Sequence, residues 1–366
     1  MSGHDAWLQA RNLLVVRLDN AGDVIMLGPA LRAVKSANPA VRLTLLASPA
    51  GAKAAALLPW IDDVIVFRSV WQDLGHLPFQ PARELAFVHD LAERAFDGAL
   101  IFTSFSQTPH VAGYVCYLAG IPLRAGESKE FGGAALSDGP CPADDDLHQV
   151  DRNLRLVASV GFPSDDARLE IAIPSEADER AGAWLLGNGI GPGDSFVLLH
   201  PGASASARRY RTEKYGGVAR LLRRQGWPVV VTGTAREAAL LDRVAANADG
   251  DVVHCDDVGL PEFAALVARA SALVCGNTLP MHLADATRTP VVALYSGTDL
   301  VTQWQPRFAP NRILRRPVSC APCYRIDCPI GQPCLDVPPD EVVAAVNELI
   351  GMHGTARLPR QEMVAC

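Results

Sequence analysis

Two short stretches, far apart in the chain, carry residue types that could move a proton and hold an anion. They cover residues 17–23 and 277–284, and each directly follows an apolar run. Asp23 opens an expected helix, whose backbone N–H groups and dipole keep a carboxylate ionised. Thr278 and the N–H groups that open the helix after it could bind a phosphate.

Both stretches lie where a buried strand is expected to end and a helix to begin. The strands in question are the apolar runs 13–16 and 272–275. Open α/β sheets place their ligands at the carboxyl ends of such strands. One site of this kind in each half predicts two similar domains with a substrate cleft between them.

Length and composition restrict the class of protein. A chain of 366 residues suggests two domains, and 49% hydrophobic with 20% charged residues describes a globular protein. The net charge of −7 argues against a nucleic-acid partner. No apolar run approaches the roughly 20 residues that span a bilayer, and the N-terminus lacks a signal-peptide core. We therefore expect a cytoplasmic protein with, at most, peripheral membrane association.

Strand-length apolar runs alternate with helical patterns in both halves. Strands are expected at 13–16, 43–47, 64–67 and 98–103, and again at 196–199, 228–232, 272–275 and 291–295. Helices are expected near 23–35, 50–58, 87–95, 215–225, 236–246 and 341–350. This alternation predicts an α/β fold with parallel sheets covered on both faces. The helical segment 174–193 is expected to hold the linker between the halves.

Four motifs together resemble glycosyltransferase family 9, the heptosyltransferases of lipopolysaccharide core assembly. They are Arg17…Gly22-Asp23 with Gly28-Pro29-Ala30-Leu31, His200–Ser204 with Arg208-Arg209-Tyr210, the segment Asn277–Ala284, and the Cys-rich segment 320–334. The resemblance implies a GT-B fold, in which two Rossmann-like domains face each other across a central cleft. Residues 1–180 would bind the acceptor. Residues 181–366, with the Cys-rich segment and a C-terminal helix, would bind the nucleotide-sugar.

The resemblance makes Asp23 the general base of an inverting, metal-independent sugar transfer. A carboxylate in this role takes the proton of the acceptor hydroxyl as its oxygen attacks the anomeric carbon; the alternative is that Asp23 only caps a helix. Gly22 would let the acceptor approach the backbone. Arg17 could pair with Asp23, meet an anionic acceptor or form an ordinary surface salt bridge. Basic residues that could contact the acceptor, or be surface charges, are Arg124, Arg68 and Lys129.

The leaving diphosphate needs hydrogen-bond donors and cations directed at its developing charge. Ser204 and Ser206 lie in a small-residue loop after a strand, and Arg208 stands where the family usually has lysine. Arginine can hold a diphosphate bidentately, although Arg208 could also be a solvated arginine. Glu237 matches the place where family members bind the ribose, or it is an exposed helix-start residue. The position of Val258 suggests contact with the base.

The segment 277–284 resembles the family element D-(T/S)-G-P-x-H-x-A-A, with two departures. Asn277 replaces the usual Asp and removes a charge, and Leu279 replaces the usual Gly and adds bulk beside a ligand. Thr278 would contact phosphate. His282, on the first turn of the helix, would contact the donor or serve as a packing residue.

Cys320, Cys323, Cys328 and Cys334 are clustered in a Pro-rich loop. Their spacing could hold structural zinc through four thiolates, but it departs from paired CxxC motifs. Free thiols, a disulfide or an iron–sulfur cluster are the alternatives. The resemblance requires no metal for catalysis.

The resemblance implies an enzyme that moves heptose or a related sugar from a nucleotide-sugar, with ADP-heptose as the expected donor. The acceptor would be a hydroxyl of lipopolysaccharide core or another surface glycan, lipid-linked or oligosaccharide, at the inner face of the inner membrane. A nucleotide-sugar epimerase and a non-catalytic nucleotide-sugar-binding relative are the alternatives. Asn277 and Leu279 motivate the latter.

Overall fold

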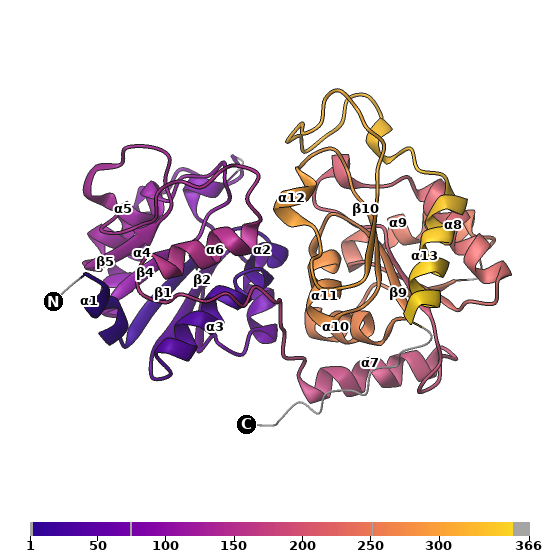
Figure 1. Cartoon of the computed structure of the whole chain (residues 1–366), viewed down its shortest axis with the longest axis horizontal. Coiled ribbons are helices and arrows are strands. Elements are labelled where there is room, and N and C mark those ends of the chain that lie inside the picture. Colours follow the sequence, from indigo (N-terminus) through magenta and orange to yellow (C-terminus); the bar gives the residue numbers. More distant parts are fainter. Residues whose placement is uncertain (1–2, 74, 251, 354–366) are drawn as a thin grey trace. The chain divides into compact units, whose positions relative to one another are not determined.

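The computed structural model describes residues 3–73, 75–250 and 252–353, in two compact units (Figure 1). Unit 1 comprises Met1–Ser175 with Val301–Gln305, and unit 2 comprises Glu176–Leu300 with Pro306–Cys366. The expected boundary was between residues 180 and 181. All of helix α7 (Ser175–Gly187) after its first residue lies in unit 2, where Arg180 on it pairs with Glu262, with Nη2 and Oε1 2.5 Å apart.

Unit 1 is built on one parallel sheet with the strand order β3-β2-β1-β4-β5. The strands are β1 (Asn12–Arg17), β2 (Arg42–Ala47), β3 (Asp63–Val66), β4 (Gly98–Ile101) and β5 (Leu123–Gly126). The α-helices are α1 (Gly3–Gln9), α2 (Ala21–Ile25), α3 (Gly28–Ala37), α4 (Pro81–Glu93), α5 (His110–Leu118), α6 (Gln149–Ala158) and α12 (Val301–Trp304). Alternate residues of β1 point to opposite faces, so Leu14 and Val16 share one core with Phe87 of α4 and Cys116 of α5.

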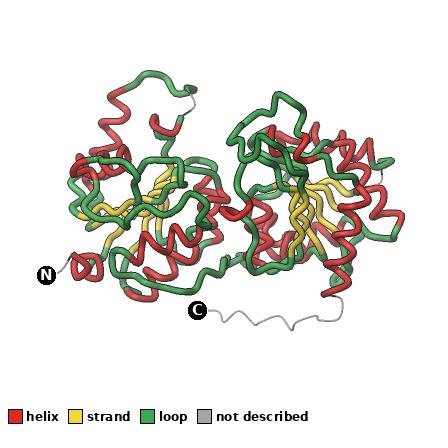
Figure 2. Tube along the Cα trace, turned by 45° about the horizontal axis from the view of Figure 1, so that its top comes forward, coloured by secondary structure: helices red, strands yellow, loops and turns green. Residues whose placement is uncertain are grey.

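Unit 2 repeats the plan with the strand order β11-β10-β9-β6-β7-β8, also parallel. The strands are β6 (Val197–His200), β7 (Val229–Thr232), β8 (Val253–Cys255), β9 (Ala272–Gly276), β10 (Val291–Leu294) and β11 (Asn311–Leu314). The helices that follow α7 are α8 (Thr212–Arg224), α9 (Ala238–Asn247), α10 (Leu260–Arg269), α11 (Leu279–Thr287) and α13 (Pro339–His353). Figure 2 shows helices on both sides of the strands in each unit. The prediction of two Rossmann-like domains is confirmed.

The strand orders place one topological switch point in each unit. In unit 1, β2 and β3 extend the sheet on one side of β1, and β4 and β5 extend it on the other side. In unit 2, β7 and β8 lie on one side of β6, and β9 to β11 lie on the other side. The registers pair Val16 with Ile101 and His200 with Cys275, so neighbouring loops leave the sheet at the same level. Ligands of doubly wound sheets bind at this crevice.

One predicted helix, near residues 23–35, is divided in the structure. Helix α2 ends at Ile25 and α3 begins at Gly28, with Pro29 in its first turn. Proline lacks an N–H and fits only the first turn of a helix, so a new helix begins there. The break leaves Asp23 on a short helix of its own.

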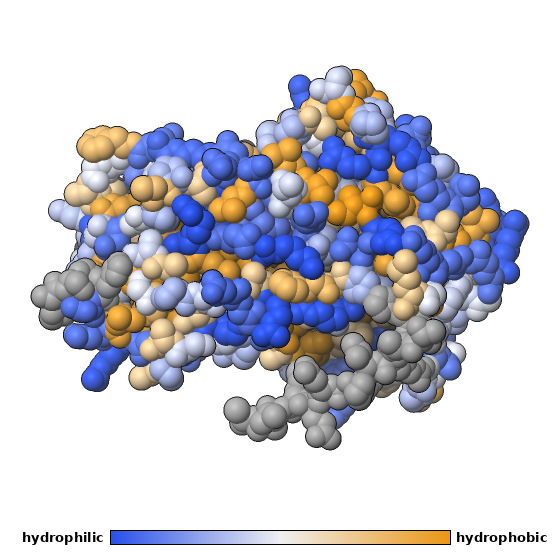
Figure 3. Space-filling view, viewed as in Figure 1, coloured by the Kyte–Doolittle hydropathy of each residue, from blue (hydrophilic) through white to orange (hydrophobic). Residues whose placement is uncertain are grey.

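Hydrophilic side chains cover most of the surface seen in Figure 3, and apolar ones interrupt it in small groups. Among the described residues, no helix has both the length and the apolar character needed to cross a bilayer. Single exposed apolar residues are normal in folded proteins and carry no further meaning here.

Candidate active site

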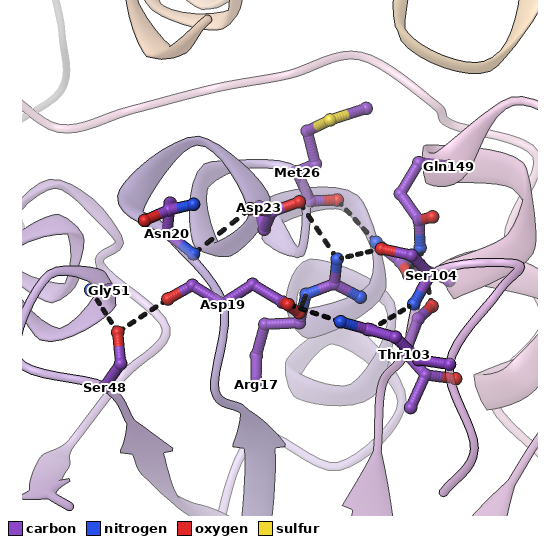
Figure 4. Close-up of polar contacts among 12 residues, drawn as sticks. Arg17, Asp19, Asn20, Asp23, Met26, Ser48, Gly51, Thr103, Ser104 and Gln149 are labelled. Carbon is purple, nitrogen blue, oxygen red and sulfur yellow. Dashed lines mark hydrogen bonds and ion pairs between the residues drawn. The ribbon is translucent and has the colours of Figure 1, made fainter. Parts of the chain in front are cut away.

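The loop after β1 gathers one cation and two carboxylates (Figure 4). Arg17, the last residue of β1, is fully buried. Its Nε lies 2.9 Å from Asp19 Oδ2, and its Nη2 lies 3.0 Å from both Asp23 Oδ1 and Ser104 Oγ. Arg17 therefore holds Asp19 and Asp23 rather than standing free for an anionic acceptor.

Asp23 stands at the third position of α2, where it has two partners. Its Oδ1 faces Arg17, and its Oδ2 accepts a hydrogen bond from the backbone N–H of Asn20 at 3.2 Å. Asn20, not Asp23, is the N-cap residue. The side chain of Asp23 keeps 19% of its surface exposed, so one edge of the carboxylate can meet a ligand. Gly22 lies buried beside it in the same turn.

Sequence reasoning missed Asp19, although it lies between Arg17 and Asp23 in the motif. Gln107 donates to its Oδ1 at 2.6 Å. Burial raises the pKa of Asp19, and the charge of Asp23 raises it further, while Arg17 and Gln107 lower it. Two close carboxylates with one guanidinium are an arrangement that shifts pKa values. An acid directly after β1 was the signal that could have identified Asp19.

Asp19→Asn is expected to raise the melting temperature of unit 1 at neutral pH. Because the pKa of Asp19 is raised by folding, the native state binds this proton more tightly than the unfolded chain. Wild-type stability is therefore lost as the pH rises from the ordinary aspartate pKa through the raised one. The difference between Asp19→Asn and wild type should shrink to zero below pH ~4, near the ordinary pKa. Thermal unfolding from pH 3.5 to 8 measures it; an equal difference at every pH would contradict the assignment.

A pocket of about 340 Å³ lies at the carboxyl ends of β4 and β5. Ser104 and Gln107 line it and also contact the Arg17 cluster. The pocket is also lined by Lys129, paired with Asp145, and by Arg152, whose guanidinium forms a buried ion pair with Glu127. Hydroxyl, amide and charged groups in one cavity suit a polyhydroxylated or anionic ligand.

Two basic residues expected at the acceptor site lie elsewhere. Arg124 pairs in register with Ala99, before the carboxyl edge of the sheet. Its guanidinium donates to backbone carbonyls of Ile121, Pro122, Ala134 and Ala135 at 2.7 to 3.0 Å. Arg124 therefore stabilises the loops on either side of β5, and its contact with the acceptor stays a prediction. Arg68 is exposed, 3.8 Å from Asp73, and does not line the pocket.

In unit 2 the loop after β6 carries the predicted serines, which differ in their surroundings. Ser204 is exposed. Ser206 donates its hydroxyl to Asp327 and accepts at its backbone oxygen from Gln332. These two contacts tie Ser206 to the Cys-rich loop, and its role at the donor site stays a prediction. The sequence could not predict the contacts of Ser206 with Asp327 and Gln332, because these residues lie far from it along the chain.

Glu237 lies against the same loop. Its Oε2 accepts from both the N–H and the hydroxyl of Thr234 at 2.9 Å. A Cβ added to Gly202 would lie 2.4 Å from Glu237 Oε1, so a larger residue there would displace this carboxylate. Burial lowers the pKa of the neighbouring His200 to about 4, so the imidazole is neutral at pH 7. Val258 is half-buried just after β8.

Arg208 enters a polar network built on Asn277. Its Nη2 lies 2.8 Å from Asp299 Oδ2, and its Nε donates to Thr298 Oγ1 at 3.1 Å. Asn277 donates to Asp299 Oδ2 at 3.1 Å and accepts from the N–H of Ser296 at 3.1 Å. Sequence reasoning missed Asp299, which follows β10 at the same edge of the sheet.

Thr278 and His282 meet at the start of α11. Thr278 is the N-cap residue, and its hydroxyl is buried without a hydrogen-bond partner among the described residues. Burial lowers the pKa of His282 to about 4, and the charge of Arg208 lowers it too. His282 is therefore neutral at pH 7 and lies within electrostatic reach of Arg208. Leu279, half-buried, begins the helix.

The four clustered cysteines are free thiols of different exposure. Cys320 is exposed, Cys323 and Cys328 are half-buried, and Cys334 is buried in the core of unit 2. Cys328 Sγ accepts from the N–H of Gln332 at 3.3 Å. Within the described part of the chain, no three His, Cys, Asp or Glu residues are grouped to hold a metal ion. Whether these thiols bind zinc stays a prediction.

The sequence model of a family described as glycosyltransferase family 9 (heptosyltransferase) matches residues 85–333. Lipopolysaccharide heptosyltransferase 2 of Salmonella typhimurium is 22% identical over 93% of this chain and 99% of its own length.

Two solved structures share the fold. The Escherichia coli ADP-heptose lipopolysaccharide heptosyltransferase II superposes with a TM-score of 0.74 at 19% identity, covering 94% of this chain and 99% of that one. A family 9 glycosyl transferase of Veillonella parvula gives a TM-score of 0.75 at 18% identity, covering 93% and 97%. Both carry the GT-B fold.

Proposed function

This chain belongs to glycosyltransferase family 9, and we propose that it transfers heptose or a related sugar from ADP-heptose to a hydroxyl of lipopolysaccharide core. The observation that carries the proposal is the placement of two chemically different sites at the two switch points. Unit 1 offers an ionisable carboxylate, and unit 2 offers donors and a cation.

In the proposed mechanism, Asp23 takes the proton of the acceptor hydroxyl while the oxygen attacks the anomeric carbon, with inversion. Arg17 and the N–H of Asn20 orient the carboxylate. The pocket lined by Ser104, Gln107 and Lys129 would bind the acceptor. Its polar lining agrees with a phosphorylated or acidic sugar, and a lipid-linked acceptor would bring the enzyme to the cytoplasmic face of the membrane.

The donor diphosphate would lie at the start of α11 and against the loop after β6. Thr278 has a buried hydroxyl that a phosphate oxygen can satisfy, and Arg208 supplies the positive charge. Neutral His282 can donate one hydrogen bond. Glu237 would accept from the ribose hydroxyls through Oε1. We propose that these groups stabilise the leaving group without a metal ion.

Thermal unfolding with ADP-, UDP-, GDP- and CDP-sugars tests the donor assignment. ADP-heptose is expected to raise the melting temperature most, by an amount set by its concentration relative to Kd. Equal shifts with all four would contradict an adenine-specific site.

A transfer assay separates this function from its alternatives. Heptose incorporation into a heptose-deficient core acceptor, with ADP release, is expected only when donor and acceptor are both present. An epimer formed from the donor alone would favour an epimerase. Donor binding without turnover on any acceptor would favour a non-catalytic relative.

A further inference from the structure

We infer that Asp299 is a positioning residue that orients Arg208 toward the donor diphosphate. The inference rests on the proposed donor role of Arg208. It is carried by the ion pair and hydrogen bonds that join Asp299, Thr298 and Asn277 around one edge of the guanidinium.

The contacts occupy one edge of the Arg208 guanidinium and leave the other edge open. Nη2 meets Asp299 and Nε meets Thr298, whereas no acceptor among the described residues binds Nη1. The side chain of Arg208 keeps 31% of its surface exposed, against 11% for Asp299. A long, flexible side chain held along one edge presents its remaining N–H groups in a defined direction, which aligns their positive charge with the diphosphate.

Asp299 is itself held in place by neighbouring donors. Thr298 donates to its Oδ2 at 2.6 Å and Asn277 at 3.1 Å. The N–H and hydroxyl of Ser296 both donate to Asn277 Oδ1, at 3.1 and 3.0 Å. Because the backbone N–H of Ser296 donates to Oδ1 of Asn277, this side chain is oriented with its Nδ2 toward Asp299. The backbone after β10 therefore fixes the orientation of Asn277, Asn277 fixes that of Asp299, and Asp299 fixes that of Arg208.

The side chain of Asn277 is an uncharged amide, so Asp299 is the one carboxylate in its contacts with Asn277 and Arg208. A carboxylate there would face Asp299 at hydrogen-bond distance, and two carboxylates so close cannot both ionise without a large energetic cost. With asparagine, one carboxylate balances one guanidinium. Asn277 and Asp299 thus act as a matched pair, and neither can be exchanged alone without changing the charge beside Arg208.

The kinetic effect of Asp299→Asn distinguishes a positioning role of Asp299 from a purely electrostatic effect of its negative charge. Asp299 is negative and lies beside a proposed diphosphate site, so through charge alone Asp299→Asn would strengthen donor binding and leave kcat unchanged. Positioning predicts the opposite outcome: kcat should fall at least about tenfold, while KM for the donor changes less than about threefold, because binding is preserved but the charge is misaligned.

The experiment is a cycle of Arg208→Ala, Asp299→Asn and the double variant, assayed with ADP-heptose and core acceptor. If Asp299 acts through Arg208, Asp299→Asn should change kcat less than about twofold in the Arg208→Ala background. Equal effects in both backgrounds, or a lower KM with unchanged kcat, would overturn the inference. Asp336→Asn, which breaks an exposed ion pair with Lys214 in the same unit, is the matched control and should change nothing.

Asn277→Asp is the second variant, used if Asp299→Asn is not folded. It keeps the shape of the side chain but places two carboxylates together. At low pH a proton on the new carboxyl restores the donated hydrogen bond to Asp299, so the ratio of variant to wild-type activity should rise as the pH falls from 8 to 6. A ratio independent of pH would contradict the network. If Arg208→Ala itself leaves donor affinity and kcat unchanged, the proposed donor role fails instead.

Discussion

Asp23→Asn is expected to lower kcat for sugar transfer by about 10²- to 10⁴-fold, the usual contribution of a general base. Asparagine keeps the size of the side chain and an oxygen for the N–H of Asn20, so α2 should remain capped. It cannot take up the acceptor proton. Donor affinity should stay within about twofold of wild type, because the donor groups lie on unit 2. Steady-state kinetics and donor titration measure the two effects separately.

Asp90→Asn is the matched control for this experiment. Asp90 is an exposed carboxylate on α4 of the same unit, and its neutralisation should leave kcat unchanged. Full activity of Asp23→Asn would contradict the assignment of the base. If Asp19→Asn then lost activity instead, the second carboxylate of the cluster would be the base.

Arg17→Met is expected to destabilise unit 1 by about 3 kcal/mol, the lower end of what breaking a buried ion pair costs. Methionine fills much of the volume but leaves Asp19 and Asp23 without their shared cation. Their side chains keep only 14% and 19% of their surface exposed, so water cannot fully replace Arg17. Urea unfolding at pH 7.5, followed by a signal from unit 1, measures the loss.

Two comparisons identify the cause of that loss. Adding Asp19→Asn to Arg17→Met should recover part of the stability, because one unpaired charge is removed. The deficit should also shrink at acidic pH, where Asp19 protonates first, since its pKa is raised. Arg42→Met removes an exposed pair with Asp63 at 3.7 Å and should cost less than about 0.5 kcal/mol. A pH-independent deficit would indicate lost packing alone.

Much of the fold could be predicted because buried parallel strands form continuous apolar runs. The runs 13–16 and 272–275 became β1 and β9, and both precede switch points. The edge strands β5, β8 and β11 were not identified because their short sequences are only partly apolar. Local sequence carries little signal for such strands, whose pairing partners lie far along the chain.

The candidate site was predicted unevenly. Residues that follow β1, β6 and β9 lie at the carboxyl edge of their sheets, as expected. A motif that directly follows a central strand must lie at the end of that strand. Arg124 was assigned from a family-like segment and Ser206 from its place in a loop after a strand, but neither signal identifies the atoms that these side chains contact. Arg124 donates hydrogen bonds to backbone carbonyls, and the hydroxyl of Ser206 donates to Asp327.

The sequence by itself determined the α/β class, the two-unit plan and the position of Asp23 at the start of a helix, since these depend on local periodicity and on residues close in the chain. Only the tertiary structure showed that Arg17 is shared between two carboxylates, that Ser104 and Gln107 join this cluster to a pocket, and that Asp299 faces Arg208. The physical reason is that hydrogen bonds and ion pairs act over a few ångströms in space. Their partners here are separated by up to 91 positions along the chain, in loops that only a folded sheet brings to one edge.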